Sequence, residues 1–146
     1  MEKFIKIIEQ AEPILREQFK KAIEKIGLWF MEKITDIDWE QKIDSFFSAQ
    51  QSPDTNNDIK ITKVEKECLN KTDLIEIAKQ KIVSNANEVL EMLNDKASNV
   101  YVIYIAYSKN KEILPKEENN YVIIKTTALT KDVQSLFNGH ELIILK

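Results

Sequence analysis

One long uninterrupted apolar run stands out in the chain. Val100–Tyr107 contains eight consecutive apolar or aromatic residues between polar flanks. It is too short to cross a membrane, and its β-branched and aromatic residues favour a strand. A continuous apolar run of this length is typical of a strand that is covered on both faces. We therefore predict that Val100–Tyr107 is the central strand of a sheet.

Shorter apolar patterns predict the strands around it. Ile59 and Ile61 alternate with polar residues, which predicts a strand with one solvated face over Asp58–Val64. Tyr121–Leu129 reads as a second strong strand and Glu141–Leu145 as a final one. Glu112–Leu114 is expected to form a short extra strand or the arm of a hairpin.

Apolar residues recur at helical spacing in the first part of the chain. The pattern predicts a helix over residues 2–26, with a kink or break near Ala11–Glu12 because Pro13 cannot donate to the helical ladder. Asp38 is the predicted cap of a second helix, with Gln41 in the capping-box position.

Two further helices are expected in the second half. Asp73 is the predicted cap of a long helix whose apolar stripe extends to Leu93. Thr130 is the predicted cap of a short helix over Lys131–Phe137, which ends at Asn138–Gly139.

The predicted fold class is α+β. N-terminal helices precede a mixed sheet of about four strands in a βαββαβ-type order, which is either ferredoxin-like or restriction-endonuclease-like. The chain is expected to form a single domain over residues 1–146. It has a helical part over 1–50, a polar loop over 51–58 and a mixed α/β part over 59–146.

The composition of the chain disfavours several classes of function. The formal net charge is −3, which disfavours a nucleic-acid partner. Two glycines leave no glycine-rich phosphate loop, so no cofactor is expected. Cys68 is the single cysteine and is expected to be a buried or half-buried structural thiol. With no apolar run of membrane-spanning length, these features predict a cytoplasmic protein without a membrane partner.

One segment resembles part of a known fold family. YVIIKTTALTKDVQSLF has the general appearance of the third strand and following helix of restriction-endonuclease-like nucleases, with Lys125 at the position of the motif lysine. That resemblance implies a metal site held by carboxylates. However, Ile123 occupies the glutamate position and no Asp occurs between Val100 and Leu129. The alternative is thus a divergent, possibly inactive nuclease-like domain.

The polar residues near the C-terminus form a speculative polar site. Lys125, the single histidine His140 and Glu141 would act together if the strands bring them together. The competing interpretation is a lysine that extends over a half-solvated strand face and a histidine that begins a strand after a glycine. We therefore predict no catalytic, cofactor-binding or metal-binding residues.

Aromatic residues are dense in the N-terminal part. Trp29, Phe30 and Trp39 are a candidate interaction surface, because aromatic side chains are enriched at interface hot spots. The competing interpretation is packing between the N-terminal helices and the sheet. The predicted function is a small non-enzymatic protein-binding module of the immunity, inhibitor or adaptor type, with another protein or itself as partner. A helix-mediated homo-oligomeric structural protein is the third alternative.

Overall fold

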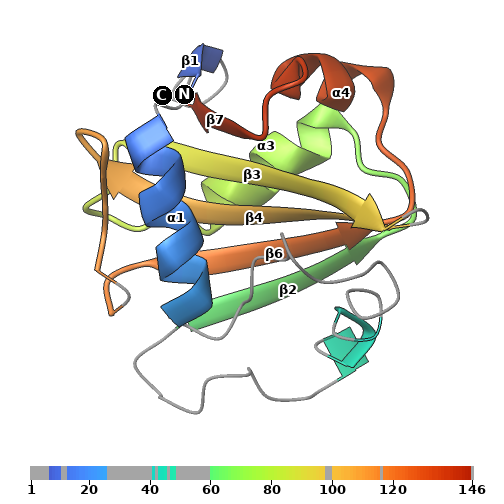
Figure 1. Ribbon diagram of the computed structural model, residues 1–146, viewed down its shortest axis with the longest axis horizontal. Coiled ribbons are helices and arrows are strands. Elements are labelled where there is room, and N and C mark those ends of the chain that lie inside the picture. The colour runs from blue at the N-terminus through green and yellow to red at the C-terminus, as the bar shows by residue number, and fades with distance from the viewer. Residues whose placement is uncertain are drawn as a thin grey trace.

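The computed structural model describes residues 7–10, 13–25, 41, 43–45, 47, 48, 60–97, 100–115 and 117–145. Helices and strands are mixed along these residues (Figure 1). In chain order the elements are β1 (Ile7–Gln10), α1 (Pro13–Lys25), β2 (Lys60–Lys66), α3 (Lys71–Gln80), β3 (Glu88–Ala97), β4 (Val100–Lys109), β5 (Glu112–Ile113), β6 (Asn120–Thr126), α4 (Lys131–Phe137) and β7 (Leu142–Leu145).

All the described strands belong to one sheet with the order β1-β7-β3-β4-β6-β2, and β5 pairs with the end of β4. Only β2 and β6 are parallel, and the other pairs are antiparallel. The prediction of a central strand at Val100–Tyr107 is confirmed, because β4 lies between β3 and β6 and its residues 102–108 are buried. The predicted α+β class is also confirmed in its broad form.

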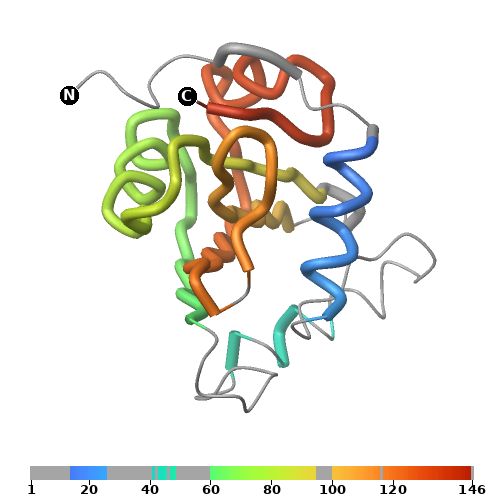
Figure 2. Tube along the Cα trace, turned by 90° about the vertical axis from the view of Figure 1, so that its left-hand side faces the viewer, coloured from blue at the N-terminus to red at the C-terminus, as the bar shows by residue number. Residues whose placement is uncertain are grey.

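Helices cover both faces of the sheet (Figure 2). On one face, α1 inserts residues spaced four apart, Leu15, Phe19 and Ile23, against the side chains of Met92, Tyr104 and Ile123. The opposite face packs against α3 and α4, whose Leu74, Ala78, Val133 and Phe137 meet the other side of β4 and β6. Successive strand residues point to opposite faces, so β4 must be apolar at nearly every position.

The expected helix over residues 2–26 is wrong in its first part. Ile7–Gln10 is a strand that pairs antiparallel with β7, and α1 begins at Pro13. Proline is favoured at the first position of a helix, where its missing N–H has no intrahelical partner and its fixed φ suits helical geometry. Pro13 therefore starts a helix and does not kink one.

The predicted long helix from Asp73 to Leu93 is also wrong. Helix α3 ends at Gln80, and the second half of that stretch is strand β3. Its true cap is Asn70, whose Oδ1 accepts from the Asp73 backbone N–H at 2.8 Å. Val89, Leu90 and Met92 are all fully buried because β3 is covered on both faces, and periodicity alone does not separate such a strand from a buried helix.

The predicted strand number and order are corrected accordingly. The sheet has six strands in its main path and β5 beside it, in place of about four, and the βαββαβ order is interrupted by β3 and β5. The short arm at Glu112–Leu114 and helix α4 are confirmed. Cys68 is exposed, so the expectation of a buried thiol is wrong. Within the described residues no helix is long and apolar enough to cross a membrane.

The carboxyl group of Glu91 is buried in the core without a described hydrogen-bond partner. Glu91 lies on β3 with a side-chain exposure of 0%, between Ile105 of β4 and Ile143 of β7. Neither of its oxygens has a hydrogen-bond partner among the described residues. Burial raises the pKa of Glu91 to about 8, because the ionised form is poorly solvated there. The folded protein therefore keeps this carboxyl protonated at neutral pH.

The protonation of Glu91 predicts a pH-dependent loss of stability. The unfolded chain releases this proton near pH 4.5 and the folded chain near pH 8. The contribution of Glu91 to the free energy of unfolding is thus fully present below about pH 4.5. It falls as pH rises to about 8, by at most about 5 kcal/mol. Glu91→Gln, which cannot ionise, should be more stable than the wild type at pH 8 and similar to it at pH 4.5.

Urea unfolding of both proteins at the two pH values measures this difference. Glu76→Gln is the matched control, since Glu76 is exposed on α3. Parallel pH profiles for the wild type and Glu91→Gln would contradict a protonated buried carboxyl.

Candidate functional site

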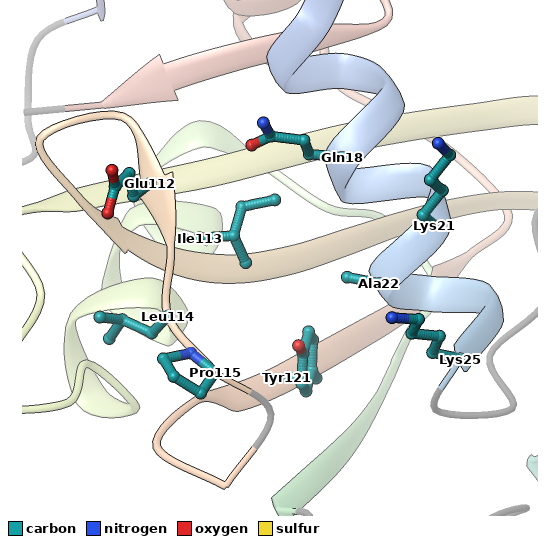
Figure 3. A pocket seen from close by; sticks show the side chains of 9 residues that line it. All are labelled: Gln18, Lys21, Ala22, Lys25, Glu112, Ile113, Leu114, Pro115 and Tyr121. Carbon is teal, nitrogen blue, oxygen red and sulfur yellow. The ribbon is translucent and has the colours of Figure 1, made fainter.

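A groove of about 850 Å³ opens between helix α1 and the arm formed by β5. We call it the α1–β5 groove, and Figure 3 shows the helix residues on one side, the arm residues on the other and Tyr121 between them. It is lined by Gln18, Lys21, Ala22, Lys25, Glu112, Ile113, Leu114, Pro115 and Tyr121. Its volume is in the range of pockets that bind small ligands or side chains of a partner.

The helix wall exists because α1 is amphipathic. Phe19 and Ile23 are fully buried against the sheet, so the positions beside them on the helix surface face the groove. Lys21 and Lys25 are both exposed and stand one turn apart. Neither ammonium group forms an ion pair with any residue that the structure describes. Like charges at this spacing destabilise a helix slightly, although Lys25 by itself lies in the last turn of α1, where a positive charge is favourable.

The opposite wall is held by a tight turn. Asn110 and Lys111 adopt left-handed φ values of 53° and 66°, which is the geometry of a two-residue hairpin turn. The carboxylate of Glu88, which is buried, accepts from the Lys111 backbone N–H at 2.6 Å and from Ser108 Oγ at 2.9 Å. The turn therefore places β5 beside the end of β4 at a fixed position.

Asn119 fixes the other end of the arm. Its buried side chain accepts from the Tyr107 N–H at 3.0 Å and donates to the Tyr107 carbonyl at 2.9 Å. These are the two bonds that a neighbouring strand would make with Tyr107. The same amide lies 3.4 Å from the Leu114 carbonyl, which ties the arm to β4. The side chain of Asn119 thus replaces a missing strand residue and lets the arm leave the sheet.

Tyr121 contributes the polar group at the bottom of the groove. The residue is 2% exposed, yet it lines the groove. Its hydroxyl makes no hydrogen bond to any residue within the described part of the chain. Burial, and then the nearby negative charge of Glu117, raise the pKa of Tyr121 to about 12. At neutral pH the phenol is therefore a hydrogen-bond donor and not a base.

Lys125 lies elsewhere, on β6 and on the face covered by α1. Its Nζ lies 3.1 Å from Asp44 Oδ1 and 5.7 Å from the centre of the Phe47 ring. Its charge is therefore compensated by an ion pair and a cation–π contact, both with residues of the N-terminal part.

Glu141 and His140 precede β7. Glu141 lies 3.5 Å from Arg16 and 3.7 Å from Lys20, and so links the start of β7 to helix α1. The His140 backbone N–H donates to the Phe137 carbonyl at the end of α4. Strands β3 and β4 separate β7 from β6. The structure therefore does not bring Lys125 together with His140 and Glu141.

Trp29, Phe30 and Trp39 lie outside the described residues, so their role stays a prediction. No cluster of three metal-ligating side chains occurs among the residues that the structure describes. The groove residues were not singled out by sequence reasoning, because its two walls come from segments about 90 residues apart. The one feature of the sequence that points to the groove is the predicted strand or hairpin arm at Glu112–Leu114, since such an arm leaves the plane of the sheet.

The anchoring role of Asn119 predicts a large effect of truncation. Asn119→Ala leaves the buried N–H and carbonyl of Tyr107 without these partners, which should cost about 2–4 kcal/mol of unfolding free energy. Hydrogen exchange at the Leu114 amide should also become faster, because that N–H bonds to the same carbonyl.

Asn85→Ala is the matched control for urea unfolding. Asn85 is exposed and its Nδ2 donates to the exposed Glu118 of another loop, so its loss should cost less than about 0.5 kcal/mol. Equal effects of the two substitutions would contradict the anchoring role.

Comparisons with known proteins add no relative for this chain. No protein-family model, no curated protein and no solved structure matches it. Its candidate function therefore has to be argued from the geometry of the α1–β5 groove.

Proposed function

We propose that the protein is a non-enzymatic protein-binding module that holds a segment of its partner in the α1–β5 groove. The observation that carries the proposal is an open groove with a mixed apolar and polar lining, in which two ammonium groups and one hydroxyl have no partner among the described residues. Binding sites typically combine an apolar lining with a few oriented polar groups. Immunity, inhibitor and adaptor roles all use such a surface.

The chemistry of the lining favours binding over catalysis. Catalysis of proton transfer needs a group whose pKa lies near the working pH. The pKa of Tyr121 is about 12, and Glu112 lies exposed on the opposite wall. The groove thus offers donors and charges for recognition, but no paired acid and base around a common point.

The nuclease-like alternative has less support. Ile123 is fully buried in the core, and Lys125 is paired with Asp44. Phosphodiester cleavage of that class needs carboxylates beside the lysine to hold a metal ion. A helix-mediated homo-oligomeric structural protein is the other alternative, and the candidate interaction residues Trp29, Phe30 and Trp39 lie outside the described residues.

Filling the groove should weaken the binding of peptides. A random peptide library is selected on the wild-type protein, and the affinities of enriched peptides are measured by fluorescence anisotropy. Ala22→Trp places an indole in the groove and should weaken these peptides at least about tenfold, because it removes the apolar contact area. Gln18→Trp, from an exposed position on the same wall, provides a second variant that fills the groove.

Ser135→Trp is the matched control, since Ser135 is exposed on α4 at the opposite face of the sheet. Circular dichroism and thermal unfolding establish that the variants remain folded. Peptides that bind all three variants as tightly as the wild type would rule out the groove as the docking site.

A further inference from the structure

We infer that the α1–β5 groove recognises an extended partner segment that presents an acidic side chain next to an apolar one. This inference rests on the proposed function and names the chemistry of the segment. It follows from three features of the groove: two lysines without a described ion-pair partner, a Tyr121 hydroxyl without a described hydrogen-bond partner, and the apolar residues of the arm.

The lysines select the acidic side chain. Lys21 and Lys25 lie one helical turn apart on the same wall, and neither is neutralised by a described residue. The chain as a whole carries a net charge of −3, so this pair is a local positive site on a mildly acidic protein. A carboxylate at this wall can interact with both ammonium groups. The segment therefore gains charge complementarity where no described residue forms an ion pair with these lysines.

Tyr121 provides a directed hydrogen bond at the bottom of the groove. Its ring is almost fully buried, which fixes the direction of its hydroxyl. In Figure 3 the Lys25 ammonium points toward the Tyr121 side of the groove. A carboxylate seated there accepts from the phenol and attracts the ammonium at once. A hydrogen bond to a charged acceptor is stronger than one between neutral groups, so Tyr121 favours an acid over an amide.

The arm supplies the apolar contact and determines on which wall of the groove the acidic side chain lies. Ile113 and Pro115 form the apolar part of the wall opposite the helix, whereas the side chain of Leu114 packs against the core cluster on the α3 and α4 face of the sheet. Glu112 stands at the end of this wall, far from Tyr121 in Figure 3. Its negative charge repels an acid placed at that end of the arm. The charge of Glu117 acts on Tyr121, so an acid at the phenol needs the ammonium groups of the two lysines to offset that repulsion. The acidic side chain is thus directed to the helix wall and the apolar side chain to the arm.

The composition of selected peptides tests this inference. Peptides enriched on the wild type should carry Asp or Glu beside an apolar residue, and their affinity should fall with added salt. Lys25→Met retains the aliphatic stem and should weaken them about threefold to tenfold, and Lys21→Met/Lys25→Met at least about tenfold. Tyr121→Phe, which removes only the hydroxyl, should weaken them about fivefold.

A double-mutant cycle separates recognition from a structural role. Replacing the acidic residue of the peptide by its amide should cost little further affinity in the Lys21→Met/Lys25→Met variant, because the interacting charges are already gone. Lys131→Met is the matched control, since Lys131 is exposed on α4. A lysine that only stabilises the end of α1 would alter thermal unfolding and leave the cycle additive.

The possible outcomes distinguish the two proposals. Selected peptides that lose affinity in Ala22→Trp, but lack acids and tolerate the lysine substitutions, would overturn this inference and leave the groove as a docking site. Peptides that ignore Ala22→Trp would overturn both. Dimerisation measured by light scattering that disappears in Ala22→Trp would assign the groove to a second copy of the chain and would also overturn the inference.

Discussion

The burial of strand β4 on both faces is the constraint on which the rest of the structure depends. Residues 102–108 of this strand are buried, with Tyr104 facing α1 and Tyr107 facing α3. The Tyr107 hydroxyl donates to the Ala78 carbonyl at 2.6 Å, which satisfies a polar group in the middle of an apolar layer. A strand covered in this way needs neighbours on both edges and helices on both faces. The order of the remaining elements supplies them.

The groove exists because three different segments pair with successive parts of one edge of β4. Strand β6 pairs with Tyr101–Ile105, and the end of β4 is then covered in turn by the amide of Asn119 and by β5. Because β5 is only two residues long, the chain must enter and leave the sheet within a short distance. The resulting arm stands opposite α1 and leaves space between them. The groove thus depends on buried polar groups, Asn119 and Glu88, that hold the arm without lining the groove themselves.

The sequence pattern predicts correctly those elements whose signal lies within their own residues. Val100–Tyr107 and the helix over Lys131–Phe137 carry their own signals, a continuous apolar run and a left-handed stop at Asn138–Gly139. Strand β3 was mistaken for helix because its apolar residues face both sides, and this removes the alternation that marks a strand. Strand β1 was missed since its pairing with β7 spans almost the whole chain, and such long-range contacts leave no local pattern.

The groove could be predicted even less well than the fold. Lys21 and Lys25 look like any solvated helix face until the arm is placed opposite them, and Tyr121 looks like an ordinary strand residue until its hydroxyl is seen to lack a partner among the described residues. Glu141 is the opposite case, because its sequence position suggested a polar site. In the structure its carboxylate instead forms ion pairs with Arg16 and Lys20, which link β7 to α1.

Native-state hydrogen exchange of the backbone amides tests the central position of β4 most directly. The account predicts that amides within Val102–Tyr107 exchange only when the whole protein unfolds and are among the slowest in the chain. Exchange of these amides as fast as that of the outer strand β2 would contradict a strand enclosed by neighbours and helices on every side.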